Sequence, residues 1–89
     1  MLERELIVAN RLGLHARATA KLVQTLSGFR CSSTLSAKGR EVNAKSIMGV
    51  MLLAAGTGTP VLLRVDGEDE AAALEAVAGL FARNFDEDG

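Results

Sequence analysis

Residues Asn10 to Ala20 read Asn-Arg-Leu-Gly-Leu-His-Ala-Arg-Ala-Thr-Ala, and they contain the only histidine of the chain, His15. Gly13, two residues earlier, allows the backbone to turn freely. After the histidine, apolar residues recur with helical spacing at Ala18, Leu22, Val23 and Leu26. Gly28 is a favourable residue just past a helix end. The pattern predicts a helix over residues 16–27, with His15 at or just before its N-terminus and Arg17 in its first turn.

This predicted helix start is suited to binding an anion. The first N–H groups of a helix have no partner within it, and the helix dipole places partial positive charge there. Arg17 adds a full charge and a fork of donors that matches phosphate oxygens. A histidine with the usual pKa of about 6.5 is mostly neutral near pH 7 and nucleophilic. The arrangement therefore predicts phosphoryl transfer through a phosphohistidine at His15.

Two other kinds of function fit the same residues. In a small regulatory or ligand-binding α+β module, His15 and Arg17 would only bind an anion reversibly. In a structural protein–protein adaptor, the contact surface would be formed by Ile47, Met48 and Met51, although helical spacing does not decide how many of these side chains face outward. Covalent phosphate on His15, as opposed to reversible anion affinity, distinguishes phosphoryl transfer from the first alternative.

The remaining sequence predicts four strands and two further helices. Apolar and alternating patterns predict strands over residues 4–9, 31–35, 40–43 and 61–66. Lys38-Gly39 forms a turn that joins the second and third strands as a hairpin. A short helix opens at Ser46, a favourable N-cap residue. Its helical spacing is carried by Ile47, Val50, Met51 and Ala54.

A third helix is predicted after the last strand. Acidic residues 68–70 suit a helix start, and the helix ends near Arg83-Asn84. Its apolar stripe comprises Leu74, Val77, Ala78 and Phe81. The final residues, Asp86 to Gly89, are expected to form a frayed acidic tail. The order β-α-β-β-α-β-α predicts an α+β two-layer sandwich, with three helices on one face of a four-stranded antiparallel sheet, in a single domain over residues 1–89.

Composition excludes several functions. The net charge of −1 offers no basic field for nucleic acid. One histidine and one cysteine cannot form a structural zinc site, so no metal is expected. The single cysteine, Cys31, excludes an internal disulfide, fits a reducing cytosol and is expected to be a small core residue. No signal peptide is recognised at the start, and no apolar stretch approaches the ~20 residues that span a membrane.

Two motifs resemble signatures of one family. Gly13-Leu14-His15-Ala16-Arg17 resembles the active-site signature of HPr, the histidine-containing phosphocarrier of the bacterial phosphotransferase system. Residues 45–51, Lys-Ser-Ile-Met-Gly-Val-Met, resemble the second HPr signature, which carries the regulatory serine. The two motifs lie at the family spacing, and 89 residues fit one HPr domain. The family usually has proline after the arginine, where this chain has Ala18; alanine is a good helix former, so we expect the helix start to be kept.

The resemblance implies an HPr-like open-faced sandwich and a stoichiometric carrier without a cofactor. Phosphate would arrive from phosphoenolpyruvate through enzyme I and leave for EIIA domains, in sugar uptake or its regulation. His15 would accept the phosphoryl group, through Nδ1 in the family. Arg17 would neutralise its oxygens, together with the backbone N–H groups of Ala16 and Arg17.

The resemblance also implies regulation and docking. Ser46 would be phosphorylated by an HPr kinase/phosphorylase in bacteria that have one, and Ile47, Met48 and Met51 would form an apolar docking patch. The ending Phe85-Asp86-Glu87-Asp88 is similar to the nitrogen-related paralogue NPr, whereas the Ser46 segment resembles carbohydrate HPr. We expect a cytoplasmic monomer.

Overall fold

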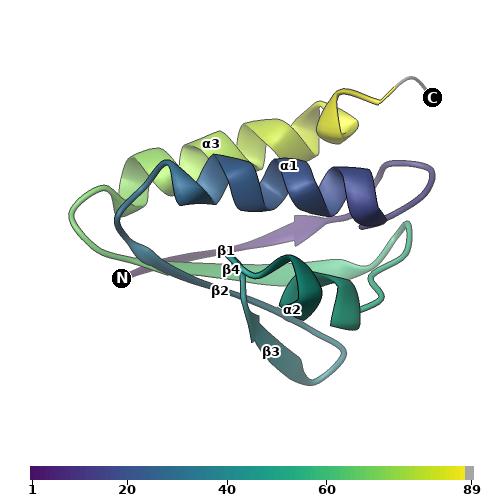
Figure 1. Cartoon of the computed structure of the whole chain (residues 1–89), viewed down its shortest axis with the longest axis horizontal. Coiled ribbons are helices and arrows are strands. Elements are labelled where there is room, and N and C mark those ends of the chain that lie inside the picture. Colours follow the sequence, from purple (N-terminus) through teal and green to yellow (C-terminus); the bar gives the residue numbers. More distant parts are fainter. Residues whose placement is uncertain (88–89) are drawn as a thin grey trace.

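The computed structural model of the chain describes residues 1–87. Its elements, shown in Figure 1, are in chain order β1 (Leu2–Ile7), α1 (Ala16–Ser27), β2 (Ser32–Ala37), β3 (Arg40–Asn43), α2 (Ile47–Leu52), β4 (Pro60–Asp66), α3 (Glu70–Ala82) and a final 3-10 turn, η1 (Asn84–Asp86). The predicted order β-α-β-β-α-β-α is confirmed, and η1 is added to it.

The four strands form one sheet in the order β1-β4-β2-β3, and every neighbouring pair is antiparallel. Along β4, Val61, Leu63 and Val65 are buried and alternate with residues of the opposite face. Helices α1 and α3 lie side by side over the face that these residues occupy, while α2 packs against α1 and β3 (Figure 1). The other face is left open, so the predicted α+β open-faced sandwich is confirmed.

The bounds of β1, β2 and α2 differ from the prediction, and the starts of β2 and β4 are each shifted by one residue, to Ser32 and Pro60. β1 spans Leu2–Ile7, where 4–9 was predicted, because these residues pair along β4 from Val65 to Pro60. β2 extends to Ala37, because the hairpin ladder continues to the pair Ala37–Arg40. The second helix ends at Leu52, and Ala54, predicted on its stripe, has a left-handed φ of 50° outside it.

The apolar stripes of the long helices form the core with the sheet. All four stripe residues predicted for α1 are buried, and in α3 Leu74, Val77 and Phe81 are buried while Ala78 is half-buried. Cys31 is 1% exposed, which agrees with its prediction as a small core residue. Asp69 precedes α3 without capping it, since its carboxylate accepts hydrogen bonds from the backbone N–H groups of Arg30 (2.7 Å) and Cys31 (2.9 Å). The start of α3 is thereby tied to the entry of β2.

The prediction of a frayed acidic tail is wrong for its first two residues. Asn84, Phe85 and Asp86 form a left-handed turn, with φ values of 53°, 57° and 58°. The turn buries Phe85 completely, with its ring centroid 4.9 Å from that of Phe81. Burying a phenylalanine contributes about 1.5–3 kcal/mol. This burial offsets part of the cost of the left-handed backbone, which is about 1–3 kcal/mol for each strained residue. Asp88 and Gly89, also in the predicted tail, lie outside the described residues.

Candidate functional site

The loop that leads into α1 is fixed against the loop that follows α2. Gly13 has a φ of 69°, and a Cβ at this position would lie 2.7 Å from the carbonyl oxygen of Ala55. The N–H of Leu14 donates to the same oxygen at 2.9 Å. The buried hydroxyl of Thr19 donates to the carbonyl of Leu14 at 3.1 Å. Glycine is therefore required at position 13, and the loop presents the next residue, His15, in one orientation.

His15 is the N-cap residue of α1, as its position in the sequence predicted. Its backbone is extended, and its Nδ1 accepts a hydrogen bond from the backbone N–H of Arg17 at 3.3 Å. The side chain is 28% exposed, so solvent and ligands reach the ring. The lone pair of Nδ1 therefore points to the helix end, where unpaired N–H groups and the dipole favour negative charge.

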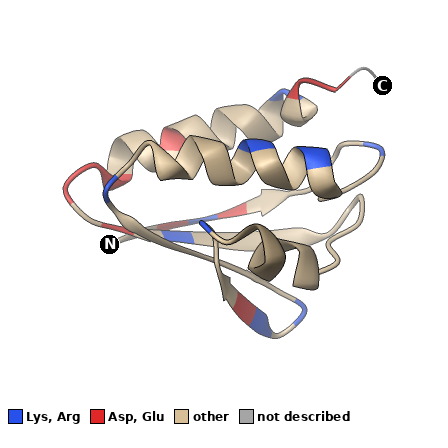
Figure 2. Ribbon diagram, in the orientation of Figure 1, with Lys and Arg blue, Asp and Glu red and all other residues tan. Residues whose placement is uncertain are grey.

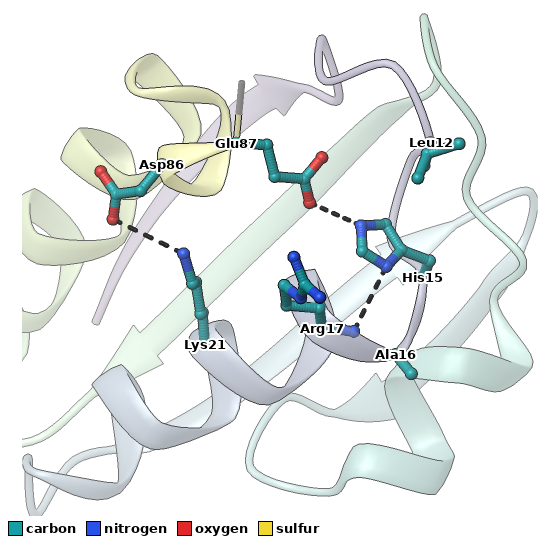
Figure 3. Close-up of a pocket in the computed structure, with 7 residues that line it drawn as sticks. All are labelled: Leu12, His15, Ala16, Arg17, Lys21, Asp86 and Glu87. Atoms are coloured by element: carbon teal, nitrogen blue, oxygen red, sulfur yellow. Dashed lines mark hydrogen bonds and ion pairs between the residues drawn. The ribbon is translucent and has the colours of Figure 1, made fainter. Parts of the chain in front are cut away.

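Arg17 and Lys21 bring positive charge to this end of α1 (Figures 2 and 3). Arg17 is exposed, and within residues 1–87 its guanidinium forms no hydrogen bond or ion pair. The ammonium of Lys21 donates to the carbonyl of Phe85 at 2.7 Å and lies 4.0 Å from the carboxylate of Asp86. Lys21 is thus engaged in holding η1, whereas Arg17 is available to an incoming anion.

Glu87 occupies the opposite side of the His15 ring. Its Oε2 lies 2.5 Å from His15 Nε2, and its Oε1 accepts from the side-chain amide of Asn10 at 3.2 Å (Figure 3 shows the first of these contacts). Burial raises the pKa of Glu87, but hydrogen bonds from Asn10 and His15 and the charge of Lys21 outweigh it, so that its pKa is lowered. Sequence reasoning missed Glu87; the one available signal was Phe85, an aromatic residue within an acidic segment.

These residues line an open pocket of about 580 Å³. Figure 3 shows its lining, which consists of Leu12, His15, Ala16, Arg17, Lys21, Asp86 and Glu87. The pocket lies at the helix start, and His15 and Arg17 both line it; the guanidinium of Arg17 has no ion-pair partner among residues 1–87. A tetrahedral anion in this pocket would meet the helix N-terminus, the guanidinium and a nucleophilic nitrogen together. The structure therefore brings together all the residues predicted around His15.

Ser46 is the N-cap of α2, as predicted. Its hydroxyl accepts a hydrogen bond from the N–H of Gly49 at 3.1 Å. The residues predicted for docking are exposed, with Ile47 at 46%, Met48 at 76% and Met51 at 44%. Leu52 and Leu12 are also exposed, at 62% and 67%, and were missed because an apolar residue in a short helix or a loop carries no sign of its direction.

Two further properties concern the described part of the chain. Residues 1–87 contain no group of three histidine, cysteine, aspartate or glutamate side chains that could hold a metal ion. The helices within these residues are too short or too polar to cross a bilayer.

Comparisons with known proteins agree with the fold and the motifs. The family model for the PTS HPr component phosphorylation site matches residues 2–83. The phosphocarrier protein HPr of Xylella fastidiosa (strain 9a5c) is 68% identical over 88 residues, which cover 99% of each chain. The crystal structure of an HPr from Thermoanaerobacter tengcongensis has a TM-score of 0.96 and 39% identity, with 100% of both chains covered. A crystal structure of an HPr dimer from the same organism has a TM-score of 0.79 and 40% identity, and covers 98% of this chain and 100% of that one.

The fold and the comparisons agree on a class, the phosphocarrier proteins of the phosphotransferase system. Within that class, the chain belongs to the HPr family, as its two motifs predicted.

Proposed function

We propose that this chain accepts a phosphoryl group on Nδ1 of His15 from enzyme I charged by phosphoenolpyruvate, and passes it to EIIA domains. The observation that carries the proposal is the direction of Nδ1, which accepts the N–H of Arg17 and so faces the start of α1. The other ring nitrogen is engaged by Glu87. Nδ1 is therefore the nitrogen with a lone pair directed at an anion-binding position.

The surroundings of Nδ1 stabilise the transferred group. In transfer, the negative charge of the phosphoryl oxygens is met by the backbone N–H groups of Ala16 and Arg17 at the helix start. The guanidinium of Arg17, unpaired within residues 1–87, adds a charge-assisted hydrogen bond. Because the pocket is open and the His15 side chain is 28% exposed, a partner protein can reach the transferable group. The chain acts as a stoichiometric carrier.

We assign partner docking to an apolar patch beside the site. The docking patch comprises Leu12, Ile47, Met48, Met51 and Leu52, all at least 44% exposed. Exposed methionines adapt to differently shaped surfaces, which suits a carrier with several partners. Ser46 opens the helix that carries most of this patch, so phosphorylation by an HPr kinase/phosphorylase would place negative charge at its edge. Sugar uptake, or its regulation, is the process that such a carrier serves.

We further propose that the chain works as a cytoplasmic monomer. An HPr from Thermoanaerobacter tengcongensis has been crystallised as a dimer, so a measurement of the oligomeric state of this chain tests the proposal directly. Sedimentation at micromolar concentration should give the mass of one chain of 9.3 kDa, and a mass of two chains would contradict the proposal.

The decisive experiment is incubation with phosphoenolpyruvate and enzyme I, followed by intact-mass spectrometry. One phosphate per chain is expected, labile in acid and stable in base, as is typical of a P–N bond. His15→Ala should fold and take none. Binding of inorganic phosphate without a covalent adduct would instead favour the anion-binding module, and phosphate retained by His15→Ala would place the acceptor elsewhere.

A further inference from the structure

We propose that Glu87 is a positioning residue for phosphoryl transfer: it fixes the tautomer of His15 and stabilises the charge that the ring gains when Nδ1 is phosphorylated. This inference rests on the proposed function, in which His15 is the acceptor. It concerns an acidic residue near the end of the chain, 72 positions from the histidine. Its role follows from the contacts on the two sides of the ring.

The hydrogen bonds of His15 assign its tautomer. A neutral imidazole has one N–H and one lone pair, and an ionised carboxylate can only accept. The N–H of Arg17 donates to Nδ1, so Nδ1 carries the lone pair. Glu87 faces Nε2 at 2.5 Å and accepts a hydrogen bond from the N–H of that nitrogen. The two contacts, from opposite ends of the chain, select the same tautomer and keep Nδ1 nucleophilic.

The position of Glu87 is fixed by a hydrogen bond to its carboxylate and by the anchored turn that precedes it. The side-chain amide of Asn10, which is 1% exposed, donates both to the carbonyl of Gly13 (2.7 Å) and to Glu87 (3.2 Å). The buried Phe85 anchors the turn, and Lys21 donates to its carbonyl. Glu87 is 12% exposed, so its geometry is set by protein groups more than by water.

Phosphorylation of Nδ1 requires no proton transfer at this nitrogen, because its lone pair is free to attack. The lone pair of Nδ1 forms the bond to phosphorus while the bond from phosphorus to the donor atom breaks, and that electron pair stays on the donor. The His15 ring becomes a phosphoimidazolium that keeps its proton on Nε2. The facing carboxylate stabilises this cation, as in catalytic triads, where a carboxylate orients the ring and stabilises the imidazolium. When phosphate leaves, the pair of the N–P bond returns to Nδ1.

The other charged groups near His15 and Glu87 do not reverse the stabilisation of the phosphoimidazolium by Glu87. Arg17 and Lys21 from α1 and Asp86 from η1 line the same pocket. Lys21 lies 4.0 Å from Asp86, and its positive charge also helps to lower the pKa of Glu87 and so favours the ionised carboxylate. Glu87 lies on the Nε2 side of the ring, away from Nδ1, where the phosphoryl group binds.

The test compares Glu87→Ala and Glu87→Gln with wild type and with Glu75→Gln, a matched loss of one carboxylate at an exposed position on α3. Rates of phosphorylation by enzyme I are measured at fixed pH, and proton NMR follows the imidazole N–H of His15. Glu87→Ala should slow phosphorylation roughly tenfold, as expected for losing one charge-assisted hydrogen bond near the surface. Glu87→Gln, which keeps an oxygen acceptor but loses the charge, should lie between Glu87→Ala and wild type.

The NMR signal reports the contact independently of transfer. Wild type and Glu75→Gln should show a downfield Nε2–H resonance that exchanges slowly with water, and Glu87→Ala should lose it. Equal or faster phosphorylation of Glu87→Ala would overturn the inference while leaving His15 as the acceptor. A wild-type chain that shows the N–H resonance but takes no phosphate would overturn the proposed function itself.

Discussion

The side-chain amide of Asn10 lies 3.2 Å from the carboxylate of Glu87, although the two residues are 77 positions apart. Asn10 begins the loop that presents His15, and Glu87 follows the last turn of the described chain. The same amide also donates to the carbonyl of Gly13 at 2.7 Å. One buried side chain therefore sets the loop before α1 and the turn after α3 relative to each other, and the candidate site is built where they meet.

Replacing Arg17 with alanine should slow transfer without weakening the fold. Its guanidinium has no partner within residues 1–87, and an exposed charge contributes little to stability. Loss of a charge-assisted contact to the phosphoryl group should raise the barrier by about 1.5–3 kcal/mol. Initial rates of His15 phosphorylation and thermal melts measure the two effects. Arg30→Ala, at an exposed position in the loop between α1 and β2, is the matched control, and an Arg17→Ala variant as fast as this control would contradict the prediction.

Substitutions of Ser46 should separate capping from regulation. Ser46→Ala removes the acceptor for the Gly49 N–H and should cost roughly 0.5–2 kcal/mol in unfolding free energy. Ser46→Asp keeps an acceptor at the N-cap, so we expect it to be at least as stable as Ser46→Ala. Its charge lies next to the docking patch, and we expect much slower phosphorylation by enzyme I.

Denaturant melts and initial rates on wild type and both Ser46 variants provide the measurement. Equal rates in all three proteins would leave Ser46 with a capping role alone. An unfolded Ser46→Asp variant would contradict the assignment of Ser46 as the N-cap of α2.

Gly13→Ala should destabilise the protein more than Gly39→Ala. Both glycines have a left-handed φ, 69° and 77°, which costs alanine about 1–2 kcal/mol. A Cβ at position 13 would also meet the Ala55 carbonyl oxygen at 2.7 Å, whereas a Cβ at position 39 would have no neighbour within 4 Å in the described part of the chain. The loop must therefore move in Gly13→Ala, and phosphorylation of His15 should slow as well. Equal melting temperatures for the two variants would show that the close contact is relieved without cost.

Asp69 should make the stability of the fold fall at acidic pH. The N–H groups of Arg30 and Cys31 stabilise the charged carboxylate and lower the pKa of Asp69, although partial burial opposes them. A carboxyl whose pKa is lower in the folded state stabilises the fold above its unfolded pKa, about 3.9, and this contribution is lost as pH falls through the folded value. Asp69→Asn should therefore be less stable than wild type at pH 7, and the difference should shrink towards pH 2.

Thermal melts from pH 7 to pH 2 check this prediction. Glu68→Gln, at the exposed neighbouring position, is the control and should follow the wild-type curve. A constant difference between Asp69→Asn and wild type at every pH would indicate that packing, and not the charge of Asp69, is responsible.

Local patterns predicted most of the fold, because burial of one helix face leaves a regular trace in the sequence. The bounds of α1 were predicted to the residue, since Ala18, Leu22 and Leu26 define its stripe and Gly28 follows it. The motif around His15 lies on adjacent residues, so its placement at a helix start was also predicted. These features depend on neighbours within a few positions.

Contacts between residues far apart in the chain leave no periodic pattern in the sequence, so they were not predicted. The contact of Glu87 with His15 spans 72 positions, and acidic residues near a chain end commonly indicate fraying. The left-handed turn at Phe85 was equally unpredictable, because it is stabilised by packing on Phe81 and not by glycine. For the docking patch, the direction of Leu52 depended on how α2 packs against α1 and β3, and that of Leu12 on how its loop packs against Ala55.

The position of β4 has a consequence for how the chain folds as it is made. It is the last strand in the sequence, yet it lies in the middle of the sheet, between β1 and β2. Until residues 60–66 have been synthesised, β1 has no strand to pair with, and the hairpin of β2 and β3 has no neighbour. Non-local pairing of this kind gives high contact order and slows folding relative to helical bundles. Sheet closure on the ribosome must therefore wait for the last third of the chain, and the exposed edges of the hairpin are open to association with other chains during that interval.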